Sequence, residues 1–154
     1  MNTALNRSWI EINLGALENN VRRIKAALPK GTVYIAVVKA DAYGHSLPRS
    51  VVRFLKGGAD MFAVANIQEV SRIRELVSSK PVLVLSPLLP DERRLVFEYG
   101  ATPAISTLEE ALDFSLIRDA FELVTGYDAV ENKSTSRLLS EDETQYGKHS
   151  KQEK

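Results

Sequence analysis

The chain has 154 residues, which is enough for one domain of ordinary size. Its 20 lysine and arginine residues balance its 20 aspartate and glutamate residues, so no basic surface points to nucleic acid as a partner. Cysteine is absent, which excludes disulfide bonds and cysteine-ligated metal. No apolar run approaches the roughly 18 residues that a membrane span needs, and residues 1–7 lack the apolar core of a signal peptide, so we expect a cytoplasmic protein.

The first quarter of the chain predicts a strand, a helix and a second strand. Residues 8–13 alternate polar and apolar side chains, which is typical of a short half-buried strand. Residues 14–28 carry leucine, valine and isoleucine at spacings of three and four, which predicts an amphipathic helix. Residues 33–39 form a nearly continuous apolar run that closes on Lys39, and this indicates a strand buried on both faces.

Strands and helices alternate from there to about residue 118. We predict helices over residues 47–55, 66–77, 91–99 and 107–118, and strands over residues 61–65, 81–85 and 102–106. This alternation predicts right-handed βαβ units in a parallel sheet, and hence an α/β fold. Residues 62–69 and 103–110 repeat the order of strand, helix cap, apolar residue and acidic residue. The repeat favours a (β/α) barrel over an open doubly wound sheet.

The composition changes near residue 125. Residues 125–154 carry many charged residues and few large apolar ones. Such a segment buries too little apolar surface to offset the entropy lost on ordering. We therefore divide the chain into an α/β domain at residues 1–124 and a disordered or loosely packed tail at residues 125–154.

Lys39 is the leading candidate for chemistry. Parallel sheets and barrels place their sites at the carboxyl ends of strands, and Lys39 closes a predicted strand. An amine that emerges between apolar side chains is partly desolvated, which favours the neutral, nucleophilic form that bonds to a carbonyl. The alternative is an ordinary solvated lysine at a strand end. By contrast, the acidic pair at residues 109–110 is interpreted as helix-start charge rather than as an acid/base pair.

The turn after Lys39 contains a candidate anion-binding group. The Tyr43 phenol can donate a hydrogen bond to an anion at the strand end, although an ordinary surface tyrosine is the alternative. Gly44 would allow the backbone to come close to that anion. Asp41 is interpreted as a turn residue that bonds its own backbone. The two histidines lie far apart in the sequence, so we predict no metal site.

These residues resemble a known motif. Residues 36–45, Ala-Val-Val-Lys-Ala-Asp-Ala-Tyr-Gly-His, are similar to the pyridoxal-phosphate attachment motif of alanine racemases. Residues 9–20 resemble the N-terminal strand and first helix of that family. Residues 62–69 and 81–85 resemble its next two barrel strands. The resemblance runs from about residue 7 to residue 114.

The resemblance implies a fold, a cofactor and a reaction. The fold is a partial (β/α)8 TIM-type barrel, comprising about its first four βα units. The cofactor is pyridoxal 5′-phosphate joined to the Lys39 amine, with Tyr43 holding its phosphate and Val37 and Leu85 beside its ring. The reaction is the interconversion of L-alanine and D-alanine, in which Lys39 serves as acid/base on one face of the substrate's α-carbon. The family is homodimeric, and whether this chain dimerises is left open.

The resemblance covers only part of the family's chain. Beyond about residue 114 we find no counterpart of its fifth-strand segment, nor of the tyrosine that acts on the opposite face of the α-carbon. We therefore expect a truncated racemase chain that is inactive alone. The alternatives are a non-catalytic half-barrel that still binds pyridoxal phosphate, and a small protein of the PLP-homeostasis type.

Overall fold

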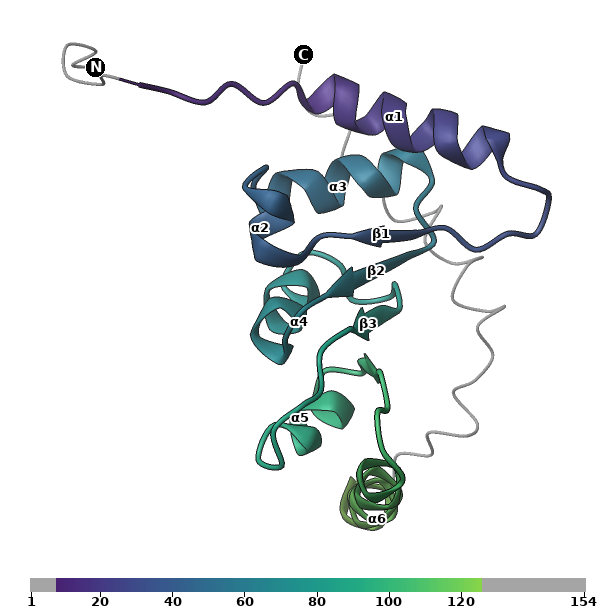
Figure 1. The fold of residues 1–154 in the computed structure, drawn as a ribbon, viewed down its shortest axis with the longest axis vertical. Coiled ribbons are helices and arrows are strands. Elements are labelled where there is room, and N and C mark those ends of the chain that lie inside the picture. Colours follow the sequence, from purple (N-terminus) through teal and green to yellow (C-terminus); the bar gives the residue numbers. More distant parts are fainter. Residues whose placement is uncertain (1–7, 126–154) are drawn as a thin grey trace.

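The computed structural model describes residues 8–125, which form a four-stranded parallel sheet with helices between the strands (Figure 1). The elements in chain order are α1 (Leu14–Ala27), β1 (Ile35–Val37), α2 (Lys39–Tyr43), α3 (Leu47–Gly57), β2 (Met61–Val64), α4 (Ile67–Arg74), β3 (Val82–Val84), α5 (Arg93–Glu98), β4 (Thr102–Pro103) and α6 (Leu108–Thr125). The strands lie side by side in the order β1-β2-β3-β4. Parallel strands in chain order with helices between them form successive βαβ units, so the predicted α/β fold is confirmed.

β1 is buried on one face only. Ala36 and Val38 are 3% and 0% exposed, whereas Ile35 and Val37 are 37% and 39% exposed. Successive side chains of a strand point to opposite faces of the sheet, so these values mark one covered and one open face. The prediction that residues 33–39 are buried on both faces is wrong, because residues 8–125 cover only one face of this strand.

The core lies between the sheet and the helices that follow the strands. The largest fully buried side chains are those of Phe62, Leu47, Ile67, Ile73, Val38, Val51, Val64, Val70, Val82, Val84, Val96 and Ser50. Burial of each large aliphatic or aromatic side chain contributes about 1.5–3 kcal/mol. α1 lies on the outer side of α3 (Figure 1) and buries Val21 there. A Cβ at Gly57 would lie 2.7 Å from the Val21 Cβ, so the close approach of these helices needs a glycine.

Arg74 joins three segments at the amino edge of the sheet. Its Nε donates to Tyr99 O at 2.7 Å, its Nη1 to Lys80 O at 2.7 Å and its Nη2 to Gly100 O at 2.8 Å. Burial lowers the pKa of the Arg74 guanidinium from its ordinary value. The side chain therefore links the end of α4 to the chain just before β3 and just before β4.

Residues 8–13 do not form the predicted strand. In Figure 1 they extend outward from the first turn of α1 and do not lie beside the sheet. Trp9 and Ile10 are 74% and 84% exposed. A strand needs a neighbour to accept its backbone hydrogen bonds, and residues 8–125 offer this segment none. Asn13 at the end of this segment caps α1, since its Oδ1 accepts a hydrogen bond from Ala16 N at 2.9 Å.

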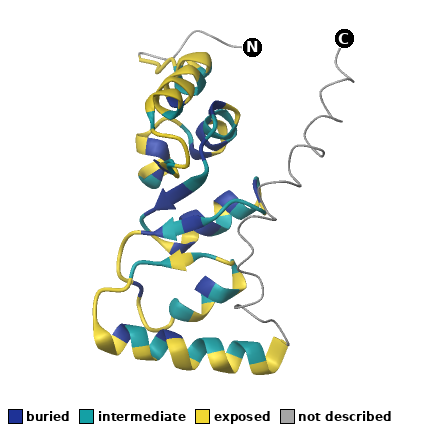
Figure 2. Ribbon diagram, turned by 90° about the vertical axis from the view of Figure 1, so that its right-hand side faces the viewer, coloured by how far each residue is buried: buried dark blue, intermediate teal, exposed yellow. Residues whose placement is uncertain are grey.

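The face of α6 that packs against the rest of the domain is not the face that carries Leu108 and Leu112. Leu108 and Leu112 are 76% and 57% exposed, whereas Glu110 and Phe114 are buried. Figure 2 shows this helix largely exposed along one side. Phe114 packs against α5, where its ring centroid lies 6.2 Å from that of Phe97.

The predicted domain boundary falls at the end of α6. This helix ends at Thr125, one residue past the predicted limit of the first domain. The rest of the predicted tail lies outside the described residues, so the division at residue 124 stays a prediction. No helix in the described part of the chain is long and apolar enough to cross a lipid bilayer.

Candidate functional site

Lys39 lies where β1 ends. The ladder continues one residue past β1, because Val38 N donates to Ala63 O at 2.8 Å. Lys39 follows as the first residue of α2 and is half-buried. Within residues 8–125 its amine has no hydrogen-bond or ion-pair partner. A ligand at the carboxyl edge of the sheet could therefore bind this amine without breaking an existing contact.

The residues after Lys39 form a left-handed turn. Residues 40–43 have φ values between 52° and 56°. The turn retains helical hydrogen bonds, including Ala42 N to Val38 O at 2.9 Å. Left-handed helical geometry costs about 1–2 kcal/mol per non-glycine residue, so the four residues store roughly 4–8 kcal/mol. Strain that the surrounding structure maintains is typical of functional sites.

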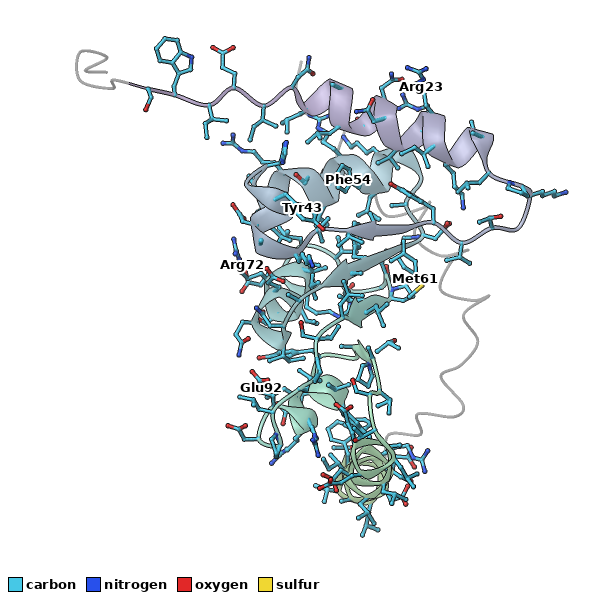
Figure 3. All side chains as sticks on the ribbon, in the orientation of Figure 1. Arg23, Tyr43, Phe54, Met61, Arg72 and Glu92 are labelled. Carbon is cyan, nitrogen blue, oxygen red and sulfur yellow. The ribbon has the colours of Figure 1, made fainter. Side chains whose placement is uncertain are left out.

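Tyr43 ends this turn on the same edge of the sheet. Tyr43 comes four positions after Lys39, which is about one helical turn. The Tyr43 side chain is 58% exposed, so its hydroxyl is open to a ligand. Figure 3 shows Tyr43 and Arg72 at this end of the sheet and Met61, the first residue of β2, at the opposite end. Gly44, with a φ of 80°, closes the turn.

Val37 and Leu85 lie on the open face of the sheet. Val37 is in register with Ala63, and Ala63 with Leu83. Side chains alternate along a strand, so Leu85, two residues past Leu83, shares the face of Val37. The two side chains are 39% and 40% exposed. The structure therefore places apolar side chains from two strands on the face next to the strand end that carries Lys39.

A buried carboxylate that the sequence analysis did not single out lies beside this turn. Glu69 Oε1 accepts a hydrogen bond from Ala40 N at 2.6 Å, and its Oε2 accepts one from Ala65 N at 2.8 Å. The predicted helix cap is confirmed, since Asn66 Oδ1 accepts from Glu69 N at 2.9 Å. Glu69 was detectable from the sequence through the repeat that places an acidic residue at the same position in residues 103–110.

Asp41 stabilises the other end of the turn. Its Oδ1 accepts a hydrogen bond from Leu47 N at 2.9 Å, at the start of α3. The prediction that Asp41 bonds its own local backbone is therefore wrong, because the left-handed turn directs the carboxylate to the next helix. Asp41 also forms an ion pair with Arg72 at 3.3 Å, and both side chains are 49% exposed. A pair as exposed as this contributes about 0–1 kcal/mol.

These groups define what the edge of the sheet can bind. A primary amine that is free to react can bond to a carbonyl carbon. An exposed phenol can donate a hydrogen bond to an anion, and apolar side chains can contact a flat ring. The arrangement therefore suits a ligand that combines a carbonyl group, an anionic group and an apolar ring.

Comparison with known proteins identifies the family. The family model described as "Alanine racemase, N-terminal domain" matches residues 12–121. The alanine racemase of Methylacidiphilum infernorum is 36% identical over 105 residues, which are 68% of this chain and 27% of that protein. The alanine racemase of Halothermothrix orenii is 33% identical over 125 residues, which are 80% of this chain and 33% of that protein.

Solved structures agree with these sequence matches. An alanine racemase from Clostridium difficile 630 has a TM-score of 0.70 at 28% identity, covering 77% of this chain and 31% of its own. A histidine racemase from Leuconostoc mesenteroides has a TM-score of 0.60 at 30% identity, covering 68% of this chain and 28% of its own. The four βα units described above are thus the first part of a (β/α)8 barrel, as predicted.

The chain spans a third or less of the length of the relatives that it matches. Within that span the family model covers most of the described residues, from before α1 to within α6. The chain therefore belongs to the alanine racemase family and corresponds to the first part of its N-terminal domain.

Proposed function

We propose that this chain supplies the cofactor-binding lysine of a pyridoxal-phosphate-dependent amino-acid racemase. One observation carries the proposal: Lys39 lies, half-buried and without a partner among residues 8–125, at the carboxyl end of the first barrel strand, at the edge where Tyr43 ends a strained turn. Sites of parallel barrels lie at this edge.

The residues present fit the chemistry of the cofactor. Lys39 would hold pyridoxal phosphate through its amine, and the exposed Tyr43 hydroxyl would donate a hydrogen bond to its phosphate. Val37 and Leu85, exposed on the same open face, would contact the ring. When bound, pyridoxal phosphate supplies an electron sink that makes the α-proton of an amino acid removable.

Lys39 would then act as a proton carrier on one side of the substrate. A neutral amine can accept the α-proton, and the resulting ammonium can return it to the same face. Racemisation also needs a group that delivers a proton to the opposite face. We propose that this second group comes from outside the present chain, since the matched region is only a third or less of the length of the relatives.

The consequence is an incomplete catalyst. Absence of one positioned acid/base group lowers a rate by about 10²–10⁴. We therefore propose that the 154-residue chain alone does not interconvert L-alanine and D-alanine at a useful rate. If the chain is catalytic in a longer protein or a complex, a homodimer of the kind implied by the family would supply the remaining groups.

Alanine is the proposed substrate because the matching relatives are named alanine racemases. A second candidate is another amino acid, since a histidine racemase shares the same part of the fold at similar identity. The described residues supply the part of the barrel that carries Lys39. We propose that the choice between these substrates depends on side chains outside residues 8–125. The other alternative is a non-catalytic protein that binds pyridoxal phosphate through Lys39.

Two measurements test the proposal on the purified chain. The first is titration with pyridoxal phosphate, followed by absorbance, for the wild type and for Lys39→Ala. We expect a saturable new band for the wild type only, and equal spectra for the two proteins would refute the cofactor site. The second is D-alanine formation from L-alanine in the presence of the cofactor. We expect no D-alanine above the background measured with Lys39→Ala. Turnover comparable to that of a complete racemase would refute the proposal that the chain is an incomplete catalyst.

A further inference from the structure

Glu69 is a buried carboxylate between the carboxyl ends of two neighbouring strands. It belongs to the first turn of α4, and only 9% of the residue is exposed. One oxygen accepts from Ala40 N beyond β1, and the other accepts from Ala65 N beyond β2, at 2.6 and 2.8 Å. Two N–H donors need two acceptors, which a carboxylate offers and a neutral side-chain amide does not.

The bond to Ala40 acts on the backbone of Lys39. Ala40 N belongs to the peptide group that joins the two residues, so Glu69 fixes the plane of that peptide. The same peptide leads into the left-handed turn at residues 40–43, which is strained. The direction in which the Lys39 side chain leaves the strand end therefore depends on this hydrogen bond.

Comparison with Glu110, a second buried carboxylate, distinguishes the bond from Glu69 to Ala40 from the bonds that a glutamate makes in ordinary helix capping. Glu110 occupies the equivalent place after β4, where its Oε2 accepts from Ser106 N at 2.7 Å and its own N donates to Thr107 Oγ1 at 3.1 Å. Glu110 is also buried, at 4% exposed, but its Oε1 has no hydrogen-bond partner among the described residues. Both glutamates thus bond the strand end before their own helix, and only Glu69 makes an additional bond to a neighbouring strand end.

We propose that Glu69 is a positioning residue for Lys39, acting through the Ala40 N–H. The inference rests on the proposed function, because it assigns to Glu69 the orientation of the amine that holds the cofactor. Glu69 does not contact the cofactor or substrate in this proposal. Its effect is to hold the Lys39 main chain in one orientation while the strained turn is present.

The test compares the rate at which Lys39 is labelled in four versions of the full 154-residue chain. Each is mixed with pyridoxal phosphate, samples are reduced with borohydride over time, and the label on the Lys39 peptide is divided by that on the peptide of exposed Lys56. Glu69→Gln places an amide nitrogen opposite one of the two N–H donors and removes one acceptor. Glu110→Gln is the matched control, because its single hydrogen bond can be kept by the amide oxygen.

We expect Glu69→Gln to lower the normalised Lys39 rate by about tenfold or more, since small displacements of a reacting group have effects of this size. Glu110→Gln should stay within about twofold of the wild type. Asn66→Ala distinguishes an effect on the orientation of Lys39 from an effect on the stability of the fold. It removes the cap on Glu69 N but leaves the bond from Ala40 N to Glu69. Asn66→Ala should label at nearly the wild-type rate even where urea unfolding shows it to be as destabilised as Glu69→Gln.

Three results would overturn the inference. Folded Glu69→Gln that labels at the wild-type rate removes the role of Glu69. An equal loss of labelling in Asn66→Ala at equal stability assigns the effect to general loosening. No label on Lys39 in the wild type refutes the proposed function itself, and the positioning role with it. Should Glu69→Gln fail to fold, Glu69→Asp replaces it, since the shorter carboxylate keeps its charge but cannot reach both N–H groups, and the same outcomes apply.

Discussion

Replacement of Arg74 by lysine should destabilise the fold much more than the same change at an exposed arginine. The guanidinium donates to three carbonyl oxygens at 2.7–2.8 Å, those of Tyr99, Lys80 and Gly100. These oxygens belong to two separate segments, one before β3 and one before β4. A lysine ammonium is a single point and cannot bridge both segments, so about two of the three hydrogen bonds should be lost. Hydrogen bonds to charged groups contribute about 1.5–3 kcal/mol each, and partial exposure reduces this, which gives an expected loss of about 2–4 kcal/mol.

Urea unfolding followed by circular dichroism measures this loss as a change in the free energy of unfolding. Arg94→Lys is the matched control, because the Arg94 side chain is 75% exposed and its i,i+4 partner is Glu98. A pair of that kind contributes about 0.3–0.5 kcal/mol, so the control should change stability by less than about 0.5 kcal/mol. If Arg74→Lys lowers the free energy of unfolding no more than Arg94→Lys does, the three hydrogen bonds of Arg74 do not stabilise the fold.

Four further substitutions test local features of the fold. Gly57→Ala places a Cβ 2.7 Å from a side chain of α1 and should lower the free energy of unfolding by about 1–3 kcal/mol. The Cβ of Gly15→Ala would meet its first neighbour at 3.4 Å, so this variant should raise the free energy of unfolding by up to about 1 kcal/mol. Thermal melts with equal midpoints for the two variants would contradict this expectation. Ser46 has a φ of 70°, so Ser46→Gly should relieve strain and raise the free energy of unfolding by roughly 1 kcal/mol, and a lowered value would count against the assigned strain. The hydrogen bond from Arg53 lowers the pKa of Glu18 below its ordinary value of 4.5. The ionised carboxylate therefore stabilises the fold at neutral pH, and this contribution is lost as the pH falls through the lowered pKa. Glu18→Gln should therefore show a flatter decline of stability in acid than the wild type, and superimposable curves would exclude the ion pair.

The sequence was sufficient for the order of the four sheet strands and the longer helices and for placing Lys39 at a strand end, but not for residues 8–13 or for the short helix α2. Short apolar runs between turn residues located β1, β2 and β3, whereas β4, which consists of Thr102 and Pro103, lies at the start of the weaker segment predicted at residues 102–106. The apolar run before Lys39 located the strand end to within two residues, because a buried strand must end where its first charged side chain emerges. The caps at Asn13 and Asn66 were also predictable, since side-chain capping is a local interaction.

What the sequence could not supply depends on contacts between distant residues. The left-handed turn at residues 40–43 contains no glycine, so local propensity gives no indication of it. Its support comes from Glu69, which lies 29 residues after Ala40 along the chain. The burial of α6 through Phe114 rather than through its leucines likewise depends on where α5 lies. Patterns within one element do not contain this information.

The proposed role of Lys39 is to hold pyridoxal phosphate at the end of β1. Borohydride reduction of the purified chain in the presence of the cofactor, followed by peptide mapping with mass spectrometry, tests it directly. We expect a pyridoxyl group on the peptide that contains Lys39, near one group per chain, and its loss in Lys39→Ala. A label absent from Lys39, or spread equally over other lysines in both proteins, would contradict it.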